Sequence, residues 1–330
     1  MDVARLIAWA LARKPVRAYL RYSERRGPVL ADSVTYRALF SLFAGVLLGF
    51  SFAALWLAGN PAAWSALLDA VDNAIPGLVG PEGLITPDAI PAPAGLSIAG
   101  ALSFAGLVGA AIGAVGSLRT AMHVIAGRPT DDIPWYWVIL RNLAIAIGAG
   151  VALGASAAVT VLGTAGLGTV ADWLGLTEDH PAVAFGTRAV AIVVTFLLDA
   201  LAVAALFRFL SGIRADARSL WAGSLLGAAG LTILQTLSGL FVGGADANPL
   251  LATFASLIAL LLWLNLSSQV ILIASSYIVE GVEERADRVR VRHGATTFPE
   301  RRVQQAEDAV AMATADLVRA RESLDAQRTE

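Results

Sequence analysis

Six long stretches that carry almost no charge lie between Ala38 and Glu280, and they constrain the fold more than any other feature of the chain. The hydrocarbon core of a bilayer is about 30 Å thick, so a helix needs about 20 apolar residues to cross it. The stretches therefore predict an all-α, polytopic membrane protein with six transmembrane helices. Trimmed at Pro, Gly and polar clusters, the predicted spans are 33–58, 95–118, 135–162, 182–208, 219–243 and 250–279.

The composition agrees with a chain surrounded by lipid. Hydrophobic residues make up 57% of the 330 residues and charged residues only 15%, whereas a soluble domain carries about 25% charged residues. There is no cysteine, which excludes disulfides, thiolate metal sites and cysteine nucleophiles. A cleavable signal is not expected, because the apolar run 6–11 is short and Arg13 and Lys14 follow it.

The distribution of basic residues predicts the orientation of the spans in the membrane. Of the 24 Lys and Arg residues, 23 lie on or near one side of the alternation, and Arg188 alone lies toward the other. The first, third and fifth connections hold acidic residues but no Lys or Arg. Because the loops on the cytoplasmic side are enriched in Lys and Arg, both termini are predicted to be cytoplasmic, in a bacterial cytoplasmic membrane.

The spans divide the chain into three parts. Residues 1–29 form a basic cytoplasmic segment, residues 30–281 the transmembrane domain, and residues 282–330 a cytoplasmic tail. Within the first part, residues 4–26 are amphipathic and interrupted at Pro15, which predicts an interfacial helix on anionic lipid. Its candidate apolar face consists of Leu6, Ile7, Leu11, Tyr19 and Leu20.

Pro299 opens a last, amphipathic helix in the tail. Its apolar residues keep a strict 3,4 spacing, which is typical of the seam of a short coiled coil. Three readings remain open: a homo-oligomer formed through this helix, a helix folded against the membrane domain, and a frayed tail. The seam residues are Val303, Ala306, Val310, Ala313, Leu317, Ala320 and Leu324.

Asp199 is the most informative residue inside the predicted membrane region. It precedes Arg208 by nine positions, which places it about 13 Å into the bilayer. A carboxylate at that depth is costly and should face the bundle interior with a partner. Arg141 on the preceding span is the first candidate partner and Arg37 the second, whereas Arg188 lies too far along the same helix. A static ion pair and a carboxylate on a substrate or ion pathway are the two alternatives.

Other polar residues of the spans are candidates for the same pathway, or for hydrogen bonds between helices. They are Gln235, Asn265 and Gln269, with Ser267 and Ser268 beside them. Glycines at helical spacing predict close packing between helices. These are the series Gly106, Gly109, Gly113 and Gly116, and the pairs Gly150/Gly154 and Gly223/Gly227.

No set of residues points to catalysis, a cofactor or a metal. The three histidines, His123, His180 and His293, fall in different predicted compartments. No His-Glu-x-x-His, nucleophile-elbow or Walker motif occurs. There is no basic patch with interleaved aromatics, so the lipid bilayer and not nucleic acid is the expected partner. An enzyme is not expected.

Three segments carry a resemblance to a known family. They are ADSVTYRALFSLF at 31–43, GSLRTAMH at 116–123, and ATFASLIALLLWL at 252–264 followed by ILI at 271–273. In their order and spacing they resemble the YihY/BrkB family of bacterial inner-membrane proteins, once mislabelled as ribonuclease BN. The resemblance covers roughly residues 20–281 and implies six helices with both ends cytoplasmic.

The roles proposed for that family are envelope transport, including lipid or solute export, and resistance to host serum factors. The chain departs from the family pattern at Ala44, where proline is usual, and at 274–276, where Ala-Ser-Ser replaces a usual Gly-Ala-Glu. The first functional hypothesis is a transporter or export factor that moves an ion, small solute or amphiphile through a cavity beside Asp199. The second is an envelope scaffold that acts through its outer loops and C-terminal helix.

Overall fold

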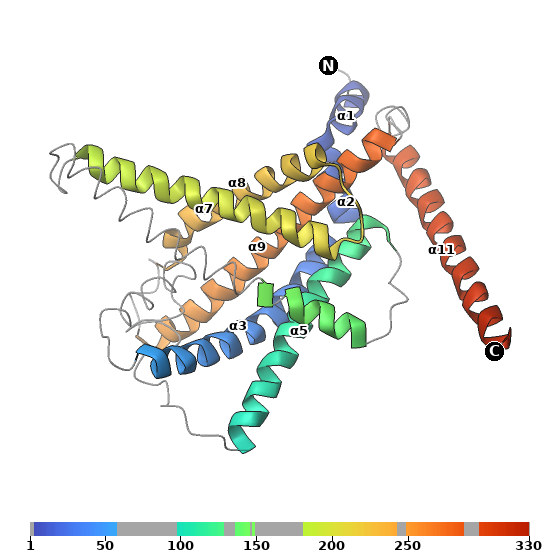
Figure 1. The fold of residues 1–330 in the computed structure, drawn as a ribbon. Coiled ribbons are helices and arrows are strands. Elements are labelled where there is room, and N and C mark those ends of the chain that lie inside the picture. The colour runs from blue at the N-terminus through green and yellow to red at the C-terminus, as the bar shows by residue number, and fades with distance from the viewer. Residues whose placement is uncertain are drawn as a thin grey trace.

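The computed structural model describes residues 3–57, 98–128, 136–145, 147–148, 181–242, 249–286 and 297–329. Every regular element in these ranges is an α-helix, so the predicted all-α class is confirmed (Figure 1). The labelled helices are α1 (Val3–Leu11), α2 (Lys14–Glu24), α3 (Gly27–Leu57), α5 (Ile98–Ala126), α7 (Pro181–Leu210), α8 (Ala217–Val242), α9 (Pro249–Ala286) and α11 (Phe298–Thr329).

Four segments in the described part of the chain are long and apolar enough to cross a membrane. They are Val108–Ala126, Ile192–Leu210, Ala217–Leu237 and Leu257–Ala286, which belong to the predicted second, fourth, fifth and sixth spans. The first predicted span lies within the long helix α3 up to residue 57. Of the third, the described residues are the short apolar helix Tyr136–Ile145 and residues 147–148. The predicted end of the membrane domain at residue 281 falls inside α9, which continues to Ala286.

The outward faces of these helices are apolar. Ile192, Leu197 and Leu201 on α7 are 50–55% exposed, Ile233 on α8 is 61% exposed and Ile258 on α9 is 56% exposed. Helices that are apolar all round belong in a large core or in a membrane. A surface of this kind, on helices of this length, is suited to contact with hydrocarbon.

Small residues bring α8 and α9 into close contact. A Cβ built on Gly223 would overlap the side chain of Ile278, and one on Gly227 would lie 3.0 Å from the Cβ of Ala274. Such glycines let two backbones approach each other, so the prediction for this pair is confirmed. By contrast, no described atom lies within 4 Å of a Cβ built on Gly106 or Gly109. The pair Gly150/Gly154 lies outside the described residues.

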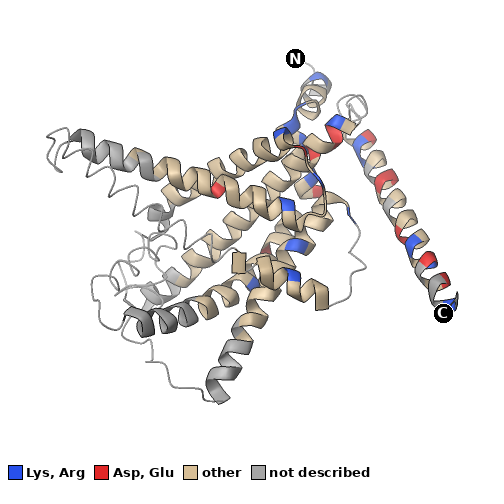
Figure 2. Cartoon of the chain, in the orientation of Figure 1, with Lys and Arg blue, Asp and Glu red and all other residues tan. Residues whose placement is uncertain are grey.

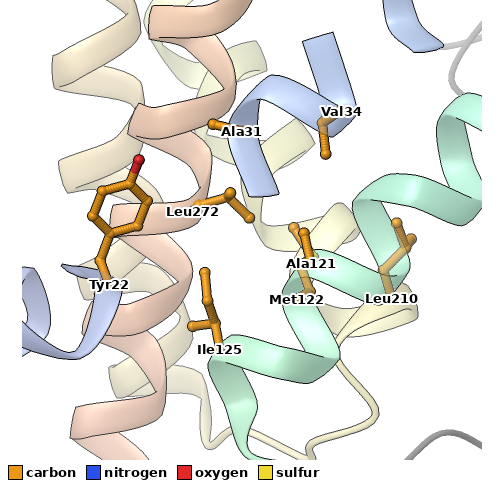
Figure 3. Packing of buried hydrophobic residues seen from close by; sticks show 8 residues of the cluster. All are labelled: Tyr22, Ala31, Val34, Ala121, Met122, Ile125, Leu210 and Leu272. Carbon is orange, nitrogen blue, oxygen red and sulfur yellow. The ribbon is translucent and has the colours of Figure 1, made fainter. Parts of the chain in front are cut away.

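The buried core lies at one end of the bundle. Here the end of α2 and the start of α3 meet the last turns of α5 and α7, and α9 passes between them. Figure 3 shows eight side chains of this cluster, among them Tyr22, Met122, Ile125 and Leu272, all at most 2% exposed. We call this region the basic end, because Lys and Arg gather there (Figure 2).

Two glycines end helices at the basic end. The amide of Gly127 donates to Val124 O (3.2 Å) and that of Arg128 to His123 O (3.0 Å), the hydrogen bonds of a Schellman motif. Gly127 has φ +62° and Gly212, after α7, has φ +69°, a region that favours glycine. A Cβ on Gly212 would lie 3.3 Å from the His123 ring. Glycine at 212 therefore allows the α7–α8 connection to lie against α5.

The C-terminal helix starts at the basic end and runs across the end of the bundle (Figure 1). Thr297 and Glu300 form a capping box, in which Glu300 accepts from Thr297 N (3.1 Å) and Thr297 Oγ1 accepts from Glu300 N (3.3 Å). Arg301 then binds Glu24 of α2, with Nε 2.7 Å from Oε1. The first turn of α11 is thereby held against α2.

Candidate functional site

Asp199 lies in the middle of the apolar helix α7 and is half-buried. Its carboxylate accepts a hydrogen bond from Gln235 Nε2 of α8 at 3.2 Å. Close packing of the two helices brings these side chains together, since a Cβ on Gly227 of α8 would lie 3.2 Å from Val203 of α7. The sequence had placed both residues among the candidates but had not paired them.

Arg141, the predicted partner of Asp199, has a different role in the structure. Its guanidinium donates to the carbonyl oxygen of Phe209, ten residues beyond Asp199 along α7, or about 15 Å. The last carbonyls of a helix have no partner within the helix, and a cation stabilises that end. The predicted Asp199–Arg141 pair is thus corrected: Arg141 caps the end of α7.

Of the two other predicted arginines, only Arg37 has a described side chain, and the structure gives it no contact with Asp199. Arg37 of α3 lies beside α5, where a Cβ on Gly113 would be 3.7 Å from Nη1. Residue 188 belongs to α7, but the side chain of Arg188 lies outside the described part of the chain. In this part, Gln235 is the hydrogen-bond partner that the structure gives Asp199.

A second polar group joins α9 to α3. Gln269 donates to Asn265 Oδ1 (2.6 Å), and Asn265 donates to Asp32 Oδ1 (2.7 Å). Asn265 also lies 3.4 Å from Thr35 Oγ1. Asn265 and Gln269 were predicted candidates, and the structure brings them together with Asp32. The two predicted serines, Ser267 and Ser268, are buried in the same part of α9.

The largest charged cluster of the described residues joins α2 to the end of α9, and it was not predicted. Glu280 accepts from Arg17 Nε (3.1 Å) and from Arg21 Nε (2.9 Å) with its two oxygens. Arg17 also binds Glu284 at 3.2 Å, and Arg21 binds Glu283. Arg17 and Glu280 are each 3% exposed. The Arg17–Glu280 pair therefore lies inside the protein and not at its surface.

Lys14 completes this cluster of three cations and three carboxylates. Its ammonium lies 4.0 Å from the centre of the Tyr277 ring, a favourable cation–π distance. Burial lowers the pKa of Lys14 below its ordinary value, although Glu284 and Glu280 oppose the shift. For Arg21, burial is outweighed by Glu280 and Glu283, and the pKa lies above its ordinary value.

The sequence did carry a signal for this cluster. Arg17 and Arg21 are four residues apart, as are Glu280 and Glu284, so each pair occupies one face of a helix. Residues 4–26 had been predicted to lie on lipid. Tyr19, at 58% exposure, remains available for that, whereas Arg17, Ala18 and Tyr22 of α2 are buried.

A cavity of about 770 Å³ opens at the basic end, between α11 and the bundle. Its charged and titratable lining residues are His123, Arg128, Glu283 and Arg319, and Ile213 and Val279 are among the apolar ones. This cavity lies at the α7–α8 connection and not beside Asp199, where a cavity had been predicted. In the described ranges, no three His, Asp or Glu residues converge as ligands of a metal ion.

The family model for the virulence factor BrkB matches residues 18–296, which include α3, α5, α7, α8 and α9 and exclude α1 and α11. No curated protein and no solved structure matches the chain significantly. The resemblance read from segments 31–43, 116–123 and 252–273 is confirmed by this match. The match and the long apolar helices show a bacterial integral membrane protein that belongs to the virulence factor BrkB family.

Proposed function

We propose that this protein is a transporter or export factor of the bacterial cytoplasmic membrane. In this proposal it crosses the membrane six times, keeps both termini in the cytoplasm, and moves an ion, small solute or amphiphile past Asp199. No step of covalent catalysis is assigned to it. The observation that carries the proposal is the hydrogen bond between Asp199 and Gln235, which joins two apolar helices.

An acidic residue within a membrane-spanning helix has a high cost, about 2.5–3.5 kcal/mol on insertion scales. A static ion pair would explain it, but Arg141 is engaged with the end of α7. The neutral amide of Gln235 can hydrogen-bond the carboxyl group in either protonation state, because an amide both donates and accepts. This favours a group that gains and loses a cation or proton over one that only fixes packing.

The orientation is supported by the position of the basic end. The ends of α5 and α7 and the start of α8 meet there, and the positive-inside rule assigns such an end to the cytoplasm. The cavity at the basic end would then open toward the cytoplasm. It lies at the end of the same α7–α8 pair that carries Asp199, and its lining includes charged residues.

The test is flux in reconstituted vesicles with Asp199→Asn, which keeps the shape and removes the charge. Two probes cover two of the proposed classes: pyranine reports proton-coupled ion movement, and an NBD-labelled phospholipid with dithionite reports amphiphile movement. The wild type should show flux above empty vesicles, and Asp199→Asn should lose at least about tenfold of it. Exposed Asp325 gives the matched control, because Asp325→Asn should leave the flux unchanged.

Normal flux through the Asp199→Asn variant would leave Asp199 with a structural role only. If thermal melting shows that the wild-type protein is folded and neither probe detects flux, ion transport and amphiphile transport are both contradicted. These results do not depend on the outer connections, which lie outside the described residues.

The second candidate function is a scaffold for envelope partners, and the structure of α11 favours it. This helix is held by its first turn through Arg301 and Glu24, and most of its described residues beyond that turn are exposed. Deletion of residues 296–330 separates the two functions. A scaffold should lose its partners, whereas a transporter should keep most of its flux.

A further inference from the structure

The apolar seam of α11 is exposed and does not face the described part of the bundle. Val303 is 58% exposed, Val310 67%, Leu317 50% and Leu324 47%. The alanines between them, Ala306, Ala313 and Ala320, are also exposed. The whole predicted seam is thus open in the described structure, on a helix that lies beside the bundle.

A different face of α11 contacts the protein itself. Arg301 and Gln304 are partly buried at the start of the helix, and Arg319 is partly buried further along. Ala311, Ala315 and Arg319 line the cavity between α11 and the bundle. These residues follow a helical spacing of three or four, on the side opposite the seam. The predicted seam therefore does not pack against the described part of the membrane domain.

The charges of α11 do not favour a lipid surface as the occupant of the seam. Between residues 300 and 328 there are six acidic and five basic residues. Helices that lie on anionic lipid carry an excess of Lys and Arg on the polar face. A narrow seam at 3,4 spacing, with charges of both signs beside it, is instead the pattern of a helix that pairs with another helix.

We propose that the seam of α11 binds the α11 helix of a second copy of this chain, in antiparallel orientation. A twofold axis relates the two copies and runs perpendicular to both helices. The direction of the pairing follows from the sizes and charges of the seam residues. The pairing is independent of the proposed transport.

The alternation of large and small seam residues fits this direction. When residue 315 lies near the axis, Ala313 of one copy faces Leu317 of the other, Val310 faces Ala320, and Ala306 faces Leu324. Each layer then combines one large and one small side chain, and the two helices stay at one distance. In a parallel pair, large residues would face large ones and alanine would face alanine, which leaves layers of unequal width.

The charges along one edge of the seam are complementary in the same register. Glu307 of one copy lies beside Arg321 of the other, and the twofold axis repeats the pair. Near the axis, Thr314 lies beside its own copy. In a parallel pair Glu307 would instead meet Arg302, and Arg321 would meet Asp316. Glu307 and Arg321 therefore have different partners in the antiparallel and parallel pairs, so their partners show which direction the helices take.

A charge-swap series on the full-length protein tests this, with the dimer dissociation constant measured by sedimentation equilibrium in detergent. Glu307→Arg and Arg321→Glu should each raise the constant, by about fivefold, because two like-charge pairs replace two attractive ones. The double variant should return it to near the wild-type value. Failure of the double variant to recover would overturn the antiparallel register.

A second pair of variants separates loss of dimerisation from loss of folding. Leu317→Asp should raise the dissociation constant by at least about 100-fold, because it buries an unpaired charge in the interface. Val318→Asp is the matched control, since Val318 is 48% exposed and lies outside the seam. Both variants should melt at the wild-type temperature. Equal dimerisation of the two variants would show that the seam is not the interface.

Cross-linking tests the same register directly, because the chain has no native cysteine. A short bis-maleimide should link Thr314→Cys to its own copy and should not link Leu324→Cys. Cross-linking of Leu324→Cys to its own copy would show a parallel pair. If the wild type is monomeric and a dye at position 324 is quenched by nitroxide-labelled lipid, the seam lies on the membrane and the proposal is wrong.

Discussion

Glu280 receives guanidinium groups from two successive turns of α2, because Arg17 and Arg21 lie four residues apart on one face. The carboxylate comes from the other end of the membrane domain, 263 residues from Arg17. Taking charges out of water is costly, and only several well-placed partners offset that cost. At this scale, the sequence showed which residue types were available, whereas their pairing depends on how α2 lies on α9.

Because Glu280 is buried, a conservative substitution there should have a large effect on the stability of the protein. Glu280→Gln keeps the shape of the side chain but removes the charge that faces two arginines. It should lower the free energy of unfolding by about 1.5–3 kcal/mol. Glu283 binds the same Arg21 but its side chain is 44% exposed, so Glu283→Gln should cost less than about 1 kcal/mol. Thermal melting in detergent compares the two, and equal costs would contradict the buried role of Glu280.

Asp216, at the start of α8, should make a pH-dependent contribution to the stability of the fold. It accepts from Ser219 N at 2.9 Å and binds Arg285 at 3.0 Å. Burial raises the pKa of this carboxyl, but the Ser219 amide and Arg285 outweigh it, so the pKa lies below its ordinary value. A carboxyl whose pKa is lowered in the folded protein stabilises the fold at pH values above its ordinary pKa, near 4. This stabilisation is lost as the pH falls through the lowered pKa of the folded protein.

Asp216→Ala should therefore cost about 0.5–2 kcal/mol at pH 7, the range for loss of a helix N-cap. The difference in melting temperature from the wild type should narrow as the pH falls below about 4. Asp216→Asn separates the two contacts, because asparagine keeps the cap and loses only the charge. A difference that stays constant from pH 7 to pH 3 would show that the charge contributes nothing.

Helices were predictable at the scale of elements because hydrophobicity and length set them locally. The spans beginning at 182, 219 and 250 correspond to α7, α8 and α9. The last of these was predicted too short, since the charged end of α9 reads as cytoplasmic tail until α2 is seen to pack on it. The glycine pair Gly223/Gly227 correctly predicted close packing, whereas Gly106 and Gly109, also at helical spacing, have no close described neighbours. Spacing shows that two helices can approach closely, and the position of the partner decides whether they do.

Alanine substitutions at two glycines should differ in their effect on stability, because only one of the glycines lies in the contact between α8 and α9. Gly223→Ala forces a methyl group into Ile278 and should destabilise the protein by about 1–3 kcal/mol, as overpacking does. Gly109→Ala in α5 meets no described atom within 4 Å and should be neutral or slightly stabilising, because alanine favours helix. Thermal melting compares the two variants. A neutral Gly223→Ala would show that α8 and α9 are not in close contact.

On the scale of the whole molecule, the helices that suit a membrane share one end with the basic residues, and α11 lies across that end (Figure 2). The charge distribution predicted this arrangement without any knowledge of packing, because the membrane sorts basic residues by side. The partner of Asp199 could not be predicted in the same way. It depends on which face α7 turns toward α8, and apolar side chains cover α7 on all sides.

Single cysteines test the orientation of the whole chain, since no native thiol interferes. With both termini cytoplasmic, Ser65→Cys, Thr177→Cys and Ala247→Cys should react with a membrane-impermeant maleimide in intact cells. Ala215→Cys, in the α7–α8 connection at the basic end, should react only after the cells are opened. The reverse pattern would invert the proposed orientation.

The buried pairs between α2 and α9 also bear on how the protein is made. Ribosomes add about 5–20 residues per second, so roughly 13–50 s separate the synthesis of Arg17 from that of Glu280, 263 residues later. Throughout that interval the nascent N-terminal helix has no carboxylates to bind. Stalled chains that end before residue 280 should therefore leave α2 open to trypsin, and chains that extend past α9 and clear the ribosome should protect it. The final turns of the last span thus act as the closing step of assembly, which secures the first segment of the chain to be synthesised.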